Sequence, residues 1–96
     1  MLIRIVKLTF QEDKIDDFVA IYKKYRKHIR NAEGCTYVEL LQNESQKNIF
    51  FTYSHWKNES YLNNYKNSTI FGEVWPQTKA LFSAKPEAWS TSKIDF

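Results

Sequence analysis

Residues 50–71, FFTYSHWKNESYLNNYKNSTIF, take the chain from a strand into a helix through a single tryptophan, Trp56. Apolar and aromatic side chains dominate the first part, which predicts a strand over residues 49–55. Asn58 follows shortly afterwards and is a residue type that commonly caps a helix. The helix that it begins carries apolar and aromatic side chains at helical spacing, namely Tyr61, Leu62 and Tyr65.

The chain before this junction predicts a strand, a long helix and a second strand. Residues 2–10 are rich in β-branched and aliphatic side chains, which favours a strand. Apolar side chains then recur at helical spacing after a cap-like start at Asp13, which predicts a helix of about 17 residues that closes before Gly34. An extended segment follows from Cys35 to Leu41. The polar segment QNESQKN, residues 42–48, predicts a hairpin turn.

The chain after the junction predicts a second helical region and a last strand. Ser68 is another candidate helix cap. Pro76 lies within a helical pattern, and its ring and missing N–H predict a kink or a new turn that begins there. Residues 86–96 predict a fourth strand. The order β-α-β-β-α-β predicts one α+β domain over residues 1–96, with a ferredoxin-like antiparallel sheet that is backed by helices on one face.

Both faces of this sheet are predicted to be apolar. The strand at residues 49–55 alternates between two apolar or aromatic sets, and so does the first strand. Helices cover only one face of such a sheet, so the other face needs a different cover. A second copy of the chain would supply it, which predicts a homodimer with two sheets face to face. The alternative is a one-sided sheet with scattered exposed aromatic side chains. The alternating sets of the first strand are Leu2/Val6/Leu8/Phe10 and Ile3/Ile5/Thr9.

The composition excludes several classes of protein. The chain is 43% hydrophobic and 17% aromatic, which is typical of a folded domain rather than a disordered one. No apolar run approaches the roughly 20 residues of a membrane span, and the N-terminus has no signal-peptide pattern, so we expect a cytoplasmic location and no membrane contact. The single Cys35 excludes an intrachain disulfide.

Most of the net charge of +3 comes from KKYRKHIR, residues 23–30. A basic run of this kind would suit a nucleic-acid surface, but no aromatic stripe for base stacking accompanies it. Cations near the end of a helix also complement the helix dipole and keep a face solvated. We therefore expect a solvated helix face and no nucleic-acid partner.

Four segments resemble the antibiotic biosynthesis monooxygenase (ABM) family, a dimeric α/β-barrel group within the ferredoxin-like folds. They are EGC (residues 33–35), YSHWKN (53–58), NSTIF (67–71) and KALFSAKPEAW (79–89), so the resemblance covers nearly the whole chain. It implies that Trp56 and Phe50 face a cavity between sheet and helices, while Tyr53 and His55 face a partner subunit. It also implies a small aromatic molecule as the ligand.

The resemblance implies that Tyr61, Phe71 and Trp75 complete an apolar pocket for a planar ring, together with Trp56 and Tyr65. The alternative for Tyr61 and Phe71 is a core position, because aromatic side chains dominate cores. The indole N–H of Trp56 and the phenol O–H of Tyr65 need partners when they are buried, which suits groups that orient a substrate. We expect both of these residues to act in catalysis.

Two polar side chains are further candidates. His28 would serve as a catalytic base if it pointed from the long helix into the cavity, and the alternative is a solvated helix histidine. Arg4 is a lone cation among apolar neighbours and would face an anionic ligand. The alternative for Arg4 is a salt bridge with Glu39 or another acid.

The chain departs from its relatives at positions that carry chemistry. Many relatives have a glutamate and a histidine where this chain has Ser54 and Tyr65, which removes the obvious acid–base pair. Haem-degrading relatives carry an asparagine and a histidine ligand where this chain has Val6 and Trp75. No Gly-rich phosphate loop occurs and the histidines show no metal-ligand spacing, so we expect no haem, flavin or metal.

Two functions follow from these features. The first is a cofactor-independent monooxygenase, an oxidoreductase acting on a small electron-rich, quinol-like aromatic substrate in the cavity. The second is a non-catalytic small-molecule-binding protein or an isomerase on the same dimeric scaffold, because a fold does not determine a chemistry.

Overall fold

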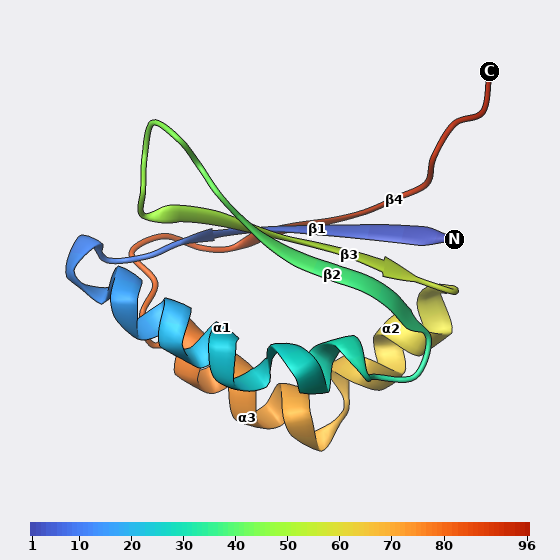
Figure 1. Cartoon of the computed structure of the whole chain (residues 1–96), viewed down its shortest axis with the longest axis horizontal. Helices are drawn as coiled ribbons and strands as arrows, with labels where there is room; N and C mark the ends of the chain where they lie inside the picture. The colour runs from blue at the N-terminus through green and yellow to red at the C-terminus, as the bar shows by residue number, and fades with distance from the viewer.

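The computed structural model describes all 96 residues as a four-stranded sheet with three α-helices on one face (Figure 1). None of the helices combines the length and the apolar character that crossing a membrane requires. The predicted order of strands and helices is confirmed. The elements are β1 (Leu2–Thr9), the short 3-10 helix η1 (Glu12–Lys14), α1 (Ile15–Arg30), β2 (Cys35–Gln42), β3 (Ile49–Trp56), α2 (Glu59–Lys66), α3 (Thr69–Lys79) and β4 (Glu87–Thr91).

All neighbouring strands are antiparallel, in the order β2-β3-β1-β4, which is the ferredoxin-like arrangement. In the register between the two central strands, Arg4 lies opposite Ser54 and Leu8 lies opposite Phe50. Successive side chains of a strand point to opposite faces. The even-numbered residues of β1 and β3 therefore face the helices, and the odd-numbered ones face away from them.

Short polar side chains begin two of the helices as the sequence predicts. The side-chain oxygen of Asn58 accepts hydrogen bonds from the backbone N–H groups of Ser60 and Tyr61, at 3.0 and 3.3 Å. The hydroxyl oxygen of Ser68 accepts one from the backbone of Phe71 at 3.2 Å. These bonds satisfy N–H groups that have no partner within the helix. Both predicted caps are confirmed.

The predicted cap-like start at Asp13 is wrong. Asp13 lies inside η1, and the residue at the cap position of α1 is Lys14, whose side chain makes no capping hydrogen bond. The first turn of α1 carries Asp16 and Asp17 instead. Their carboxylates lie near the positive end of the helix dipole, which stabilises the start of the helix by electrostatics rather than by a cap.

The sequence predicts a kink or a new turn at Pro76, and no new turn begins there, since α3 runs through this residue from Thr69 to Lys79. A proline in a helix leaves the carbonyl four residues earlier without its donor. That residue is Gly72, which is exposed, so water can satisfy its carbonyl. The last strand is shorter than residues 86–96, because Thr91 already pairs with Ile3 near the start of β1 and no strand remains to pair beyond it.

Two clusters of buried side chains fill the space between sheet and helices. The first contains Leu8, Phe10, Phe18 and Phe50. The second contains Cys35, Trp56 and Leu62. These clusters lie toward opposite ends of the central strands, since Phe50 is the second residue of β3 and Trp56 is its last. The space between them is the region where a cavity can form.

The face of the sheet that lies opposite the helices has no element across it (Figure 1) and carries apolar and aromatic side chains beside the ion pair of Lys7 and Glu87. Its side chains include a cluster of aromatic rings in which His55 packs against Tyr37 and Tyr53, with centroids 5.3 and 5.1 Å away. Large apolar side chains on its outer strands are about two-fifths exposed, with Leu41 and Trp89 both at 44%. The predicted double-sided apolar pattern is therefore present in the folded chain.

Gly34 makes the turn between α1 and β2 and has a backbone φ of 84°. This left-handed conformation favours glycine over residues with a side chain. A Cβ atom at this position would also lie 2.3 Å from Cγ of Tyr61 on α2. The contact brings the start of β2 directly against α2, so glycine is required here for two independent reasons.

Replacing Gly34 with alanine should lower the free energy of unfolding by about 2 kcal/mol or more, through backbone strain and the clash with Tyr61. Urea denaturation would measure the change. Gly72→Ala is the matched control, because Gly72 lies in α3 with open space around it. That substitution should raise stability by about 0.5–1 kcal/mol. Equal effects of the two substitutions would contradict the role assigned to Gly34.

Candidate functional site

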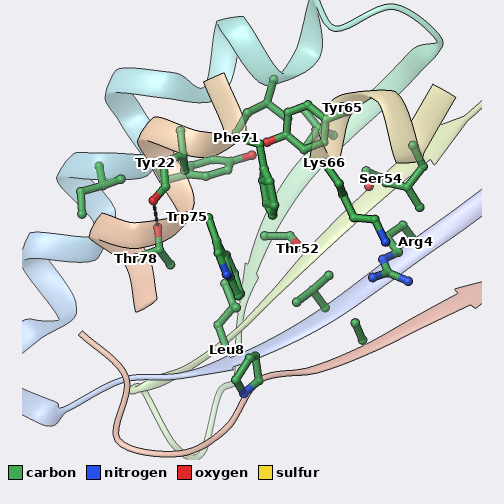
Figure 2. A pocket seen from close by; sticks show the side chains of 18 of the residues that line it. Arg4, Leu8, Tyr22, Thr52, Ser54, Tyr65, Lys66, Phe71, Trp75 and Thr78 are labelled. Carbon is green, nitrogen blue, oxygen red and sulfur yellow. Dashed lines mark hydrogen bonds between the residues drawn. The ribbon is translucent and has the colours of Figure 1, made fainter. Parts of the chain in front are cut away.

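A cavity of about 330 Å³ lies between the sheet and the helices, lined by 20 residues of which 14 are hydrophobic (Figure 2). All four strands and all three α-helices contribute to its walls. Its volume lies near the lower end of the roughly 300–1,000 Å³ that is usual for small-molecule sites. The cavity therefore fits a small, largely apolar molecule.

Small side chains on the floor of the sheet create this space. Val6 lies opposite Thr52 on one side and opposite Ala88 on the other, so three small residues form a row across the sheet. All three line the cavity. The larger Leu8 and Trp56, which belong to the two core clusters, line the cavity as well. The cavity therefore occupies the gap between the two clusters.

Aromatic rings form a continuous wall on the helical side. Trp56 packs against Tyr65 with ring centroids 5.2 Å apart, and Tyr65 packs against Phe71 at 5.3 Å. Phe71 stacks on Trp75 at 5.6 Å with an angle of 23° between the ring planes. The structure thus brings together four of the aromatic residues that the sequence singled out, and all four line the cavity.

Trp56 is a wall of the cavity and a core residue at the same time. It is only 1% exposed, and its indole N–H donates to the hydroxyl oxygen of Ser54 at 2.9 Å. Ser54 precedes it by two residues on the same strand and points to the same face. The polar group of Trp56 therefore has a partner within the protein, and what this residue presents to a ligand is its ring.

Tyr65 keeps its proton at neutral pH. Burial, with smaller contributions from the nearby Cys35 and Tyr22, raises the pKa of Tyr65 to about 12. Burial also raises the pKa of Tyr22, while the Arg26 guanidinium opposes this increase. Figure 2 shows the hydroxyl groups of Tyr22 and Tyr65 directed toward one another at the cavity wall. The pair offers two neutral phenol donors to a ligand.

Two cations lie at another part of the wall. Arg4 projects from β1 into the cavity and donates a hydrogen bond to the hydroxyl oxygen of Ser90 at 2.9 Å. Lys66 extends from the end of α2, and Figure 2 shows its amine near the Arg4 guanidinium. The suggested salt bridge between Arg4 and Glu39 is not formed, because Glu39 points to the opposite face of the sheet and accepts a hydrogen bond from Tyr37.

Three of the residues predicted for the pocket do not line the cavity. Tyr61 takes the alternative core position and packs against the second core cluster. Phe50 is 3% exposed and packs in the first core cluster, with its ring 5.1 Å from that of Phe18. It faces the helices as expected, but it lies at the filled end of the sheet. His28 is exposed on α1 and lines a second pocket beside Asn64 and Ser68. It does not reach the cavity where a base would act.

The cavity lining contains no histidine, aspartate or glutamate. The structure also contains no group of three or more metal-ligating side chains close enough to hold an ion. Trp75 and Val6 both line the cavity, and neither side chain can ligate iron. What the site can do with its own residues is desolvate a ring, stack on it and donate hydrogen bonds to it.

Sequence reasoning missed four polar lining residues: Tyr22, Thr52, Lys66 and Thr78. Thr52 could have been found, because it lies four residues before Trp56 on β3 and its side chain therefore points to the same face of the sheet. Tyr22 could have been found as well, since it follows the buried Phe18 by four residues on α1. Nothing in the sequence distinguishes Lys66 or Thr78 from other polar helix residues. Their positions depend on how α2 and α3 pack on the sheet.

A family model described as antibiotic biosynthesis monooxygenase matches residues 1–75. No curated protein matches the chain by sequence. A conserved protein from Methanosarcina mazei is similar in structure, with a TM-score of 0.91 at 23% identity over 98% of this chain and 94% of that one.

A structure described as an antibiotic biosynthesis monooxygenase has a TM-score of 0.93 at 16% identity, over 99% of this chain and 100% of that one. A protein from Mycobacterium tuberculosis has a TM-score of 0.89 at 13% identity, over 99% of this chain and 96% of that one. At these identities the structural likeness establishes a shared fold.

The raised pKa of Tyr65 should make the protein less stable at high pH. Between the ordinary tyrosine pKa of 10.0 and about 12, the unfolded chain releases this proton while the folded chain holds it. Stability is therefore complete below pH 10 and falls as the pH rises toward 12, by about 2 kcal/mol for this group. Urea denaturation at a series of pH values would measure the decline, which should be smaller in Tyr65→Phe. An equal decline in both proteins would mean that Tyr65 is not its source.

Proposed function

The chain belongs to the antibiotic biosynthesis monooxygenase family, and from this premise we propose that it is a cofactor-independent monooxygenase acting on a small electron-rich aromatic substrate such as a quinol. The observation that carries the proposal is the aromatic-walled cavity between sheet and helices. A flat ring in this space would lie against the stacked rings of Phe71 and Trp75. Burial there removes water from the substrate and orients it.

The two phenols supply the polar contacts that this chemistry requires. The substrate would react as its oxyanion, and a donor that stays protonated stabilises such a charge. Tyr65, with its raised pKa, is a donor of this kind, and Tyr22 lies beside it. No histidine or carboxylate lines the cavity, so the substrate's own proton would pass to solvent. Substrates that ionise readily should therefore react fastest.

The proposed reaction balances without an external reductant. A hydroxyarene anion gives electrons to dioxygen, one oxygen atom forms a new carbon–oxygen bond at a ring C–H position, and the other leaves as water. The ring loses four electrons and leaves as a quinone, and dioxygen takes up all four. The protein would need no haem, flavin or metal for this step, because the substrate is itself the reductant.

A second candidate is a small-molecule-binding protein or an isomerase that uses the same cavity. The observation in its favour is the cavity lining without histidine, aspartate or glutamate, since these are the usual general acids and bases. Such a protein would bind the same flat molecules without consuming oxygen. Measuring binding and oxygen uptake on the same samples separates the two candidates.

We also propose that two copies of the chain pair through the open face of the sheet, which would give the dimeric α/β barrel of the family. Ile3, Ile5 and Phe51 lie on this face, together with the ring cluster of Tyr37, Tyr53 and His55. Covering these side chains removes apolar area from water. His55 supports the same proposal, because its Nε2 atom is buried without a hydrogen-bond partner inside one chain.

Oxygen uptake with a panel of naphthols and quinols tests the proposed activity. With ¹⁸O₂, the quinone product should carry one labelled oxygen atom, and a metal chelator should have no effect. Tyr65→Phe should lower kcat by about ten- to a hundredfold, because it removes one oxyanion donor. Tyr61→Phe is the matched control, since it removes a phenol oxygen from the same helix outside the cavity. Binding without oxygen uptake would favour the second candidate, and no binding would contradict both.

Light scattering tests the proposed dimer, which should have twice the 11.5 kDa mass of one chain. Phe51→Glu places a charge on the open face and should shift the protein to the monomer, since burying an unpaired charge is costly. Lys24→Glu on the exposed side of α1 changes charge away from this face and should leave the dimer intact. A stable monomer at micromolar concentration in the unmodified protein would contradict the proposal.

A further inference from the structure

The cavity has a charged end as well as its aromatic walls. Arg4 and Lys66 are its only charged lining residues, and both are cations. We propose that the natural ligand is an aromatic carboxylate, whose ring occupies the cavity and whose carboxylate lies between these two side chains. This inference rests on the proposed function of the same cavity and narrows its substrate class to acids.

Arg4 is positioned to bind a carboxylate. It lies on the helix-facing side of β1 next to Val6, where a cation loses part of its hydration. No carboxylate of the protein lies within salt-bridge distance of it, since the only two ion pairs join other residues. Its single hydrogen bond to Ser90 holds the guanidinium in place and leaves further N–H donors free. A guanidinium with a fixed position and free donors matches a planar carboxylate well.

Lys66 brings a second positive charge to the same end of the cavity. It is the last residue of α2, where a cation also complements the helix dipole. That effect alone does not require the side chain to border the cavity. The side chain is exposed but lies along the cavity wall, with its amine near the Arg4 guanidinium (Figure 2). Two like charges at one place repel each other, and an anion between them turns this repulsion into attraction.

The rest of the cavity determines what the carboxylate is attached to. The remaining walls are mostly hydrophobic, and the aromatic row from Trp56 to Trp75 is suited to a flat ring. A volume of about 330 Å³ has room for a ring system of one or two fused rings. The phenols Tyr22 and Tyr65 lie at a different part of the wall from the cations (Figure 2). One molecule could therefore place a hydroxyl on the phenols and a carboxylate on the cations.

Binding of 2-naphthoate and 2-naphthamide to the full chain, measured by calorimetry, tests this inference. The two probes have the same shape and differ in charge. The unmodified protein should bind naphthoate about tenfold more tightly or better, and higher salt should reduce this preference. Arg4→Gln and Lys66→Gln should each weaken naphthoate binding several-fold and leave naphthamide binding unchanged. Lys79→Gln is the matched control, because Lys79 lies in the last turn of α3 outside the cavity.

Each outcome has a distinct meaning. A naphthoate preference that is lost in Arg4→Gln and Lys66→Gln but kept in Lys79→Gln supports the inference. Equal binding of the two probes, or a preference that both cavity variants retain, overturns the inference and leaves the aromatic site of the proposed function intact. Failure of both probes to bind overturns the aromatic site and the inference together. Lys66→Gln alters an exposed side chain, so its result does not depend on a change in folding.

Discussion

The register between β1 and β3 is the constraint on which the rest of the structure depends. It places Val6 opposite Thr52 and Leu8 opposite Phe50, on the face that the helices cover. A slip of one residue would exchange the two faces of a strand. Arg4 would then leave the cavity, and apolar side chains from the open face would fill it. The same pairing therefore fixes the core, the cavity and the second apolar face.

The cavity follows from an uneven distribution of side-chain size along the paired strands. Leu8 and Phe50 fill the space toward one end, where they meet Phe18. Trp56 fills the other end with Leu62. The small residues Val6, Thr52 and Ala88 lie in a row between them, and the helices above contribute the rings of Tyr65, Phe71 and Trp75, which pack against one another. The side chains that line such a cavity lack dispersion contacts on one side, and a bound ring would supply them.

The polar groups of the site differ in which hydrogen-bond donors and charges remain available to a ligand. The N–H of Trp56 is already bonded to Ser54, so this residue contributes shape. Tyr65 is held neutral by burial and remains a donor. Arg4 has one hydrogen bond to a hydroxyl group and no counter-charge within the chain. The chemistry available to the site therefore depends on phenols and cations rather than on an acid–base pair.

The sequence by itself determined the features that arise from local physics. Alternation and helical spacing predicted the order of the elements, and the caps at Asn58 and Ser68 depend on hydrogen bonds within one turn. Alternation also predicted two apolar sheet faces, because the period of a strand does not depend on its partners. Trp56 lies on a strand and the other three aromatic cavity residues lie on helices, and the resemblance of the flanking motifs to a known family is what identified them as pocket residues.

Only the tertiary structure decided which of these side chains share a space. The sequence could not show that Phe50 lies in a filled core while Trp56 borders the cavity, because both face the helices and differ only in what packs above them. It could not exclude His28 from the cavity or show that Lys66 lies near Arg4. Both positions depend on how a helix is rotated and placed on the sheet. Contacts between distant segments are set by packing of the whole chain, and no local pattern records them.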